Sequence, residues 1–339
     1  MKNESISVII VSKNEEKRIQ ACIESVIGAL NEYDDFEIIL VDSASTDRTI
    51  DIAKRYNIKI IQLRPNWQHS AAAGEHIGYL HSKGEYICFI GGDMILNQDW
   101  FKEAIPCLKK EDVAGVSGKI INNFDVNNCS SLVAYRINFG FNSLKCGEVD
   151  VLGGPAMFKR SVLKEVGGYH PFLRAGEEAE LSYRIRVKGY KLIRLPIPMV
   201  YHKSECMSLL KFLYKYQWEY VKAVGSSIRY SLRTNKQIFY KRFPAIFIAM
   251  FFNLSLLLVV VSLALLLKGY TSPITTVLAG YSLLFILLII KRKNIKDAML
   301  SILVLHISAL AICIGFLKDL PNPQEYPNNP IIIKLRTKT

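Results

Sequence analysis

The fold is indicated first by residues 7–19, which read SVIIVSKNEEKRI. A short β-branched run between polar residues is typical of a buried strand, and the charged residues after it begin a helical pattern. The same alternation continues to residue 93. The expected strands are Ser7–Ser12, Phe36–Val41, Ile58–Leu63 and Tyr86–Ile90, and the expected helices cover about 17–29, 47–56 and 71–82. Strands that alternate with helices predict βαβ units, and therefore an α/β fold on a mostly parallel sheet.

Polar residues follow each expected strand. They are the Asn14-Glu15 turn, Asp42, Arg64 and Asp93. In parallel sheets, ligands bind beyond the carboxyl ends of the strands, so these residues are candidates for one binding site. Neither a P-loop nor a GxGxxG turn follows the first strand, so a nucleotide would be held without the usual phosphate-binding glycine loop.

Asp42 and Asp93 are the acids best placed for ligand chemistry. Asp42 ends a strand, where a carboxylate can accept hydrogen bonds from a base or a ribose, although the residue taken alone favours a turn. Asp93 follows Gly91 and Gly92, which would let the backbone approach a ligand closely. An aspartate at this position can bind a divalent cation that offsets the charge of a diphosphate leaving group.

The region from about 111 to 202 should complete the cleft with the strands Val113–Ile121 and Val149–Phe158 and a helix near Glu178–Lys188. Three acids, Glu177, Glu178 and Glu180, begin that helix. Acids in a first helical turn suit the helix dipole, but one of them could also serve as a general base.

Taken together, these segments resemble the family 2 glycosyltransferases of the GT-A fold. The resemblance covers roughly residues 5–225. It is carried, in order, by SVIIVSKNEEKRI, VDSASTDRT (41–49), the strand that ends in Gly-Gly-Asp93, GGYHP (167–171), GEEAELSYRIRVKGY (176–190) and Val200-Tyr201-His202. The apolar segments that follow resemble the membrane-attached branch that builds polysaccharides or lipid-linked glycans, similar to succinoglycan-type glucosyltransferases.

The resemblance implies inverting transfer of a sugar from a nucleotide-diphosphate donor. Asn14, Glu15 and Asp42 match positions that contact the nucleoside, and Arg64 joins this donor-binding set by its place after the third strand. Asp93 matches the last acid of the metal-binding Asp-x-Asp, which implies Mg²⁺ or Mn²⁺. Glu178 matches the catalytic base.

His202 matches a histidine that meets the metal or the diphosphate in some relatives, and a purely structural histidine is the other reading. The chain also departs from the family pattern at four places. Gly91 replaces the first acid of Asp-x-Asp, and Glu178 stands where an aspartate is usual. Gly74-Glu75-His76-Ile77-Gly78 replaces Ala-Arg-Asn-x-Gly. No Gln-x-x-Arg-Trp follows the base, which favours single additions over processive synthesis.

The C-terminal part is strongly basic and apolar. Of 43 Lys and Arg and 30 Asp and Glu in the 339 residues, 18 and 5 lie after residue 200. The basic residues flank apolar runs, which indicates a membrane partner and no nucleic acid. Three uncharged stretches, 244–267, 269–290 and 298–317, each have the length of a transmembrane helix.

The expected organisation is therefore a cytoplasmic GT-A domain (1–204), a basic amphipathic interfacial segment (205–242), three transmembrane helices (243–318) and a tail (319–339). The excess of basic residues before the first span and between the second and third places the N-terminal domain in the cytoplasm. The protein is expected to be a multi-pass protein of the cell membrane. With three crossings, the tail would emerge on the opposite side.

Two further functions remain open. One is a polyprenyl-phosphate sugar synthase, whose anionic acceptor needs no general base. The other is a degenerate relative that acts as a scaffold and catalyses no transfer; Gly91 and the missing arginine favour it, whereas the joint presence of Asp42, Asp93 and Glu178 opposes it.

Overall fold

A computed structural model describes residues 4–122, 145–202, 208–234, scattered helical positions between 236 and 257, and 295–336. These residues form two compact units. The first contains residues 4–122, 145–202 and 321–336, and the second contains the described residues from 208 to 320. The N-terminal region and residues 321–336 therefore belong to one domain, although the second unit separates them in the sequence.

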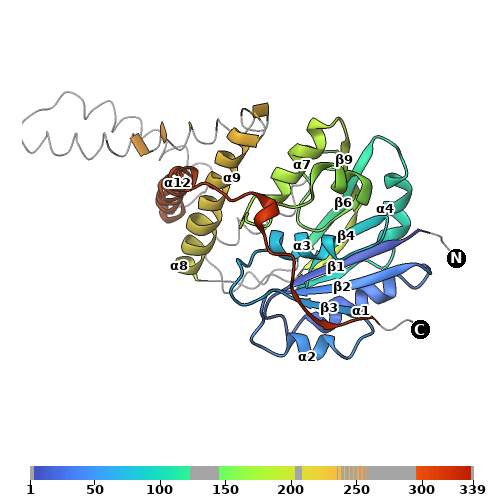
Figure 1. Ribbon diagram of the computed structural model, residues 1–339. Helices are drawn as coiled ribbons and strands as arrows, with labels where there is room; N and C mark the ends of the chain where they lie inside the picture. Colours follow the sequence, from blue (N-terminus) through green and yellow to red (C-terminus); the bar gives the residue numbers. More distant parts are fainter. Residues whose placement is uncertain are drawn as a thin grey trace, which may run out of the picture. The chain divides into compact units, whose positions relative to one another are not determined.

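The first unit is built on one mixed sheet of ten strands (Figure 1). The strands are β1 (Ile6–Ser12), β2 (Phe36–Asp42), β3 (Lys59–Gln62), β4 (Tyr86–Gly91), β5 (Met94–Leu96), β6 (Val113–Asn122), β7 (Gly147–Glu148), β8 (Ala156–Lys159), β9 (Lys191–His202) and β10 (Ile331–Lys334). Their order is β10-β3-β2-β1-β4-β8-β6-β9-β5, and β7 pairs with β9. The first four strands are parallel, as expected, while β8, β5, β7 and β10 pair in antiparallel fashion.

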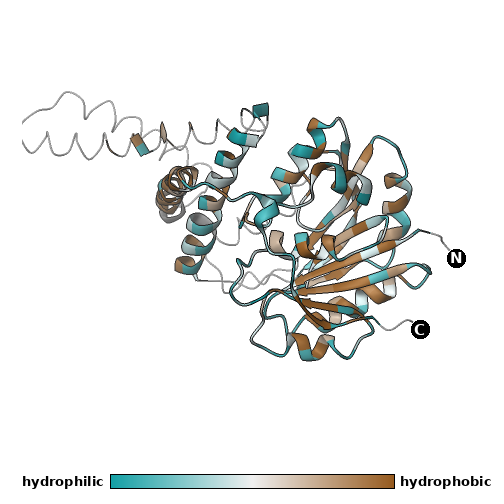
Figure 2. Cartoon of the chain, viewed as in Figure 1, coloured by the Kyte–Doolittle hydropathy of each residue, from teal (hydrophilic) through white to brown (hydrophobic). Residues whose placement is uncertain are grey.

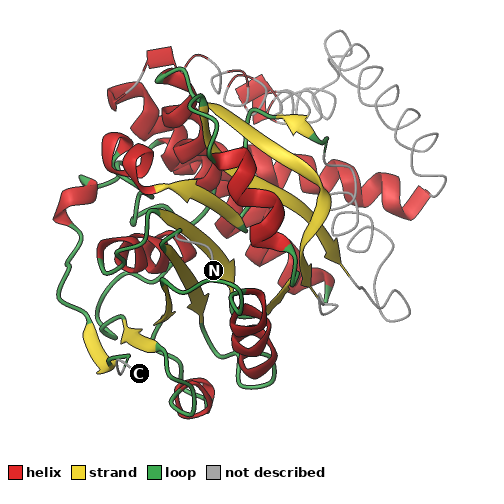
Figure 3. Ribbon diagram, turned by 90° about the vertical axis from the view of Figure 1, so that its right-hand side faces the viewer, coloured by secondary structure: helices red, strands yellow, loops and turns green. Residues whose placement is uncertain are grey.

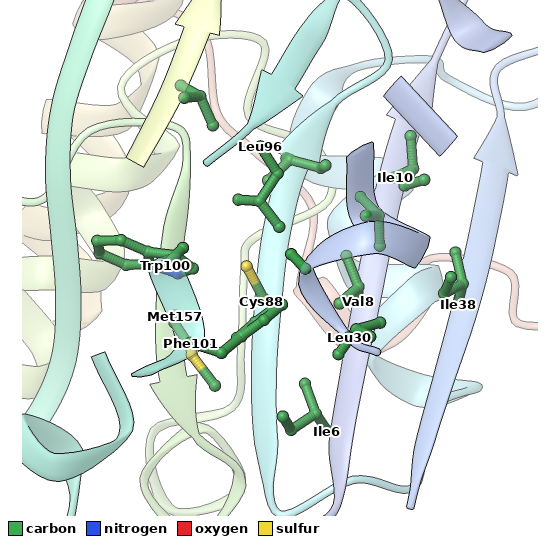
Figure 4. Close-up of a cluster of buried hydrophobic side chains, with 14 of the residues drawn as sticks. Ile6, Val8, Ile10, Leu30, Ile38, Cys88, Leu96, Trp100, Phe101 and Met157 are labelled. Carbon is green, nitrogen blue, oxygen red and sulfur yellow. The ribbon is translucent and has the colours of Figure 1, made fainter. Parts of the chain in front are cut away.

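Helices cover both faces of the sheet (Figure 3). They are α1 (Ile19–Ala29), α2 (Thr49–Ala53), α3 (Ala71–Leu80), α4 (Trp100–Leu108), α6 (Arg160–Val166) and α7 (Glu177–Val187). Because side chains alternate along a strand, Ile6, Val8 and Ile10 of β1 enter one core with α1 and α4 (Figure 4), whereas Ile9 enters the other core with α3, α6 and α7. Burial on both faces explains why these strands are mainly apolar, as Figure 2 shows.

The expected strand over 149–158 is shorter in the structure. Only Ala156–Lys159 forms β8, while residues 149–155 have no regular structure. Gly153, Gly154 and Pro155 account for the difference, because glycine weakens a strand and proline cannot donate to the ladder.

The C-terminal tail departs most from expectation. After α12 (Ile295–Phe316), the chain forms the short 3₁₀ helix Pro323–Glu325 and then β10, which pairs with β3 (Figure 1). Tyr326 is buried, and its ring packs edge-on against Trp67 and Phe172 with centroid distances of 5.6 and 5.3 Å. The tail is therefore part of the N-terminal domain.

The second unit contains α8 (Leu209–Phe212), a π-helix (Leu213–Tyr220), α9 (Val221–Thr234) and α12. The π-helical stretch changes the residue spacing, so Leu209, Leu213, Tyr220 and Val224 do not keep the single 3.6-residue face expected for an interfacial helix. Val224 and Ile228 pack against Ile312 and Phe316 of α12.

Within the described residues, one helical segment, Ala298–Phe316, is long and apolar enough to cross a membrane. It corresponds to the third expected span. The first two expected spans, 244–267 and 269–290, fall almost entirely outside the described residues.

Candidate active site

The strand register brings three of the polar strand ends into one row. Ser12 pairs with Asp42, and Asp42 pairs with Gln62. Asp42 is fully buried, and its Oδ1 accepts hydrogen bonds from the Ser45 amide (2.8 Å) and from Gln62 Nε2 (3.1 Å). Its Oδ2 accepts the Ser45 hydroxyl. Asp42 therefore holds the 43–48 loop in place from the carboxyl edge of the sheet.

The loop after β1 is bonded to the loop after β2. Asn14 has a positive φ of 56°, its amide donates to Ser45 Oγ (2.8 Å), and its Oδ1 accepts the Thr46 amide (2.8 Å). The Glu15 amide donates to Thr49 Oγ1 (2.7 Å). Asparagine tolerates a left-handed backbone better than other side chains do. The structure thus brings together the three expected nucleoside-contacting residues, Asn14, Glu15 and Asp42, as one polar ledge.

Asp93 and His202 meet beside this ledge. The pairing of β5 with β9 aligns Met94 with His202, and His202 Nε2 lies 3.0 Å from Asp93 Oδ2. Burial alone would raise the pKa of Asp93, but the hydrogen bond and charge of His202, together with the Arg18 guanidinium, hold it below its usual value. Asp93 is thus kept ionised.

A pocket of about 280 Å³ opens at this pair. Its lining includes Lys17, Arg18, Asp93, Tyr201 and His202. Arg18 is held by Glu15, whose Oε2 accepts from Arg18 Nε at 2.7 Å. Two cations and one carboxylate in the same pocket suit a ligand that carries phosphate groups and, with it, a cation.

Gly91 leaves room for the Asp93 carboxylate. A Cβ at position 91 would lie 2.6 Å from Asp93 Oδ1. A first acid at this position would therefore displace the carboxylate that His202 now holds. Lys17 and Arg18 had not been singled out from sequence, because nothing in the spacing shows that they line the pocket of Asp93.

Asp93 and His202 fit a divalent cation as a partial ligand set. The carboxylate is ionised, and an imidazole nitrogen lies within 3.0 Å of it. Among the described residues, no group of three or more His, Cys, Asp or Glu side chains has the arrangement of a complete metal site. The remaining ligands of such an ion would have to come from a bound diphosphate and water.

Glu178 lies in a different cluster, at the start of α7. Burial raises the pKa of Glu178, and burial with the charge of Glu178 raises the pKa of the adjacent Glu177 to about 8. Glu75 of α3 faces the same two acids, and burial together with their charges raises its pKa well above the usual value. The Glu75 and Glu177 side chains each have one buried oxygen without a hydrogen-bond partner among the described residues.

Tyr169 completes this carboxylate cluster of Glu75, Glu177, Glu178 and Tyr169. Its hydroxyl is buried without a partner in the described part of the chain, and the three glutamates raise its pKa in addition to burial. Glu180 has a different role, because its carboxylate pairs with Arg184 (2.6 Å), which also donates to the Gly168 carbonyl. Of the three acids in the α7 first turn, Glu180 is therefore structural.

The side chain of Arg64 is bonded to the C-terminal tail. Its Nε donates to the carbonyl of Asn329 in the tail at 2.9 Å.

Glu75 and Tyr169 are the members of the carboxylate cluster that sequence reasoning missed. The only signal was the unusual Glu75 itself, since nothing in the sequence pairs residue 75 with residue 177.

A mixed α/β sheet with an acid-lined carboxyl edge, an ionised aspartate by a cationic pocket and a separate buried carboxylate defines a glycosyltransferase of the GT-A type. Residues 7–167, just under half of the chain, match the glycosyl transferase family 2 profile. The comparisons confirm that the protein is a glycosyltransferase.

Three similar proteins illustrate the relationship. A dolichyl N-acetyl-α-D-glucosaminyl phosphate 3-β-D-2,3-diacetamido-2,3-dideoxy-β-D-glucuronosyltransferase of Methanococcus voltae is 26% identical over 231 residues, which cover 61% of this chain and 70% of the relative. A poly(ribitol-phosphate) β-glucosyltransferase of Bacillus spizizenii is 27% identical over 203 residues, covering 55% of this chain and 30% of the relative.

Among solved structures, a mannosyltransferase of Pyrobaculum calidifontis in complex with GDP-Man and Mn²⁺ aligns with a TM-score of 0.58. The alignment covers 94% of this chain and 88% of that chain at 16% identity, so it supports the fold alone.

Proposed function

We propose that this protein is an inverting glycosyltransferase that moves a sugar from a nucleotide-diphosphate donor to a lipid-linked or polysaccharide-precursor acceptor at the cytoplasmic membrane face. The observation that carries the proposal is the separation of two kinds of acid. Asp93 is held ionised beside Lys17, Arg18 and His202, whereas Glu178 lies in a buried cluster where carboxylates bind protons more tightly.

The first group suits the leaving diphosphate. Asn14, Glu15 and Asp42 would seat the nucleoside on the ledge, and Arg64, which follows β3, would contribute to donor binding. Asp93 and His202 would hold Mg²⁺ or Mn²⁺, which when bound supplies positive charge to the diphosphate. Lys17 and Arg18 add fixed positive charge in the same pocket.

The second group suits the attacking hydroxyl. Glu178 would accept the proton of an acceptor hydroxyl. The oxygen of that hydroxyl would form a bond to the anomeric carbon of the sugar, while the bond between the anomeric carbon and the diphosphate breaks. A raised pKa makes a carboxylate a stronger base, and a base is most effective when its pKa lies near the working pH. Gly154 lies beside this carboxylate, since a Cβ there would be in ordinary contact with Glu178 Oε1 at 3.6 Å.

Transfer can be measured with the detergent-purified full chain, a panel of radiolabelled UDP-, GDP- and dTDP-sugars and native lipid extract, with and without Mn²⁺. We expect an organic-extractable product that Asp93→Asn abolishes. Glu178→Gln should reduce kcat by roughly 100-fold or more with donor binding retained. Glu180→Gln is the matched control for a glutamate on the same helix turn.

Two results would redirect the proposal. Substantial transfer to a polyprenyl phosphate by Glu178→Gln would favour a polyprenyl-phosphate sugar synthase, whose acceptor is already anionic. Absence of both transfer and nucleotide binding would favour the scaffold function.

A further inference from the structure

The C-terminal tail belongs to the catalytic domain by several independent contacts. Ile331 and Ile332 pair with Gln62 and Ile61 of β3. The Tyr326 hydroxyl donates to the Gln68 carbonyl at 2.6 Å, and the Tyr326 side chain is 96% buried. These contacts reach the edge strand, the loop after it and the face of α3, so the tail is a packed part of the domain.

Further contacts fix the rest of the tail to the same domain. Lys334 Nζ donates to the carbonyls of Lys54 (2.8 Å) and Tyr56 (2.6 Å). The guanidinium of Arg336 lies 4.5 Å from the ring centroid of Phe36. A strand cannot share a hydrogen-bond ladder with a sheet on the other side of a bilayer, because the backbone groups of both must meet directly.

The chain between the two parts of the domain contains all of the apolar stretches. The segment from 203 to 242 carries nine basic residues, and the segment from 318 to 336 carries Lys318, Asp319, Glu325, Lys334 and Arg336. Charged segments of this kind do not cross a hydrocarbon core. Every crossing must therefore lie between residues 244 and 317.

We infer that this part of the chain crosses the membrane an even number of times and that the tail lies on the same side as the catalytic domain. The inference rests on the membrane attachment in the proposed function. It differs from the expectation from sequence that three crossings carry the tail to the opposite side. A single crossing by α12 alone is excluded for the same reason.

The contacts at the end of α12 agree with a return to the catalytic side. Asp319 accepts from Arg229 Nε (2.9 Å) and from Arg233 (2.8 Å) of the basic helix α9. Gly315 lies against the Lys222 backbone, and Ser226 Oγ donates to the Gly315 carbonyl (2.9 Å). The last turn of α12 is thus packed against a helix whose cations belong at a membrane surface.

The topology can be tested with reporters on the full chain in Escherichia coli. Green fluorescent protein fluoresces when it stays in the cytoplasm and does not fluoresce when it is exported across the membrane in unfolded form. Alkaline phosphatase is active only outside the cytoplasm. We expect fluorescence from both the N-terminal and the C-terminal fusion and no phosphatase activity from either. Phosphatase activity at the C-terminus, with fluorescence at the N-terminus, would overturn the inference.

A second measurement tests the tail contact in the membrane-embedded protein. The pair Ile61→Cys and Ile332→Cys should form a disulfide in isolated membranes under mild oxidation. The control pair Ile60→Cys and Ile332→Cys should form at least tenfold less, because neighbouring strand residues point to opposite faces. Equal cross-linking of the two pairs would contradict the pairing.

Carbonate washing of the membranes separates this inference from the proposed function. Release of the protein into the soluble fraction would show that it does not cross the membrane, and the proposed membrane attachment would fail. Retention, together with a tail on the opposite side, would defeat the topology while leaving the attachment intact.

Discussion

The single charged hydrogen bond between Asp93 and His202 determines how the pocket can work. It lowers the pKa of a half-buried aspartate that burial would otherwise raise. The carboxylate therefore stays available for a cation over a wider range of pH than an isolated buried acid would. This compensates in part for Gly91, which replaces the first acid of the usual Asp-x-Asp pair.

Replacing His202 should therefore move the pH dependence of donor binding. In His202→Gln the pKa of Asp93 should rise, so its negative charge is lost earlier as the pH falls. We expect the pH below which nucleotide affinity falls to rise by about one pH unit. Calorimetric titration with a nucleoside diphosphate and Mn²⁺ between pH 4 and 8 measures this, with Ile95→Val as the pocket control. No change in that pH would remove His202 from this role.

In the carboxylate cluster the pKa values are raised in the folded protein, whereas that of Asp93 is lowered. Glu177 has an ordinary pKa of 4.5 when unfolded and about 8 in the folded protein, so the folded state binds more protons between these values. The free energy of unfolding must then decrease as the pH rises through this window. Glu75 contributes in the same direction.

Glu177→Gln should accordingly flatten the decline of the thermal midpoint between pH 5 and 8 and raise the midpoint at pH 8. Glu180→Gln is the matched control: it breaks the ion pair with Arg184 and should lower the midpoint across the range. Thermal unfolding of the full chain in detergent, followed by tryptophan fluorescence, gives both curves. A Glu177→Gln curve parallel to the unmodified protein would show that Glu177 is not protonated on folding.

At the level of the elements, the first four strands were predictable because each is a continuous apolar run closed by a polar residue. Their side chains are buried on both faces, which produces that pattern directly. Asp42 and Asp93 were placed correctly at strand ends for the same reason. Their assigned roles in donor binding stay predictions.

Contacts between distant elements were not predictable. Glu75 and Glu177 lie on α3 and α7, and their meeting depends on how both helices pack on one face of the sheet. The run Ile331–Lys334 is too short to distinguish from loop, and its partner β3 lies about 270 residues earlier. Local spacing contains no information about either pairing.

The contact between α9 and α12 depends on two glycines. A Cβ on Gly315 would overlap the Lys222 carbonyl, and one on Gly225 would overlap that of Ile312. Gly315→Ala should therefore separate the helices at a cost of about 1–3 kcal/mol. Trypsin should then cleave faster after Arg229 and Arg233, which Asp319 now holds. Ile314→Ala, on an exposed neighbouring position, should leave cleavage unchanged; equal acceleration would contradict the close contact.

On the scale of the whole molecule, the domain is a single sheet assembled from both ends of the chain. Deleting residues 321–339 should expose the edge of β3 and uncover Trp67 and Phe172. We expect a thermal midpoint lower by several degrees and weaker nucleotide binding, since the 64–70 loop loses its partners. Deleting only 337–339 is the control. An unchanged midpoint after the longer deletion would show that the tail adds nothing to domain stability.

The position of β10 at the end of the chain also sets an order of events during biosynthesis. A ribosome releases the apolar stretches well before it completes residues 331–334, so the edge strand is the last part of the domain to emerge. The enzyme consequently reaches its finished sheet only after the apolar stretches between residues 244 and 317 have been translated. A chain whose insertion leaves its end in the wrong compartment would keep an open sheet edge, which is the kind of surface that proteases and chaperones recognise in unfinished proteins.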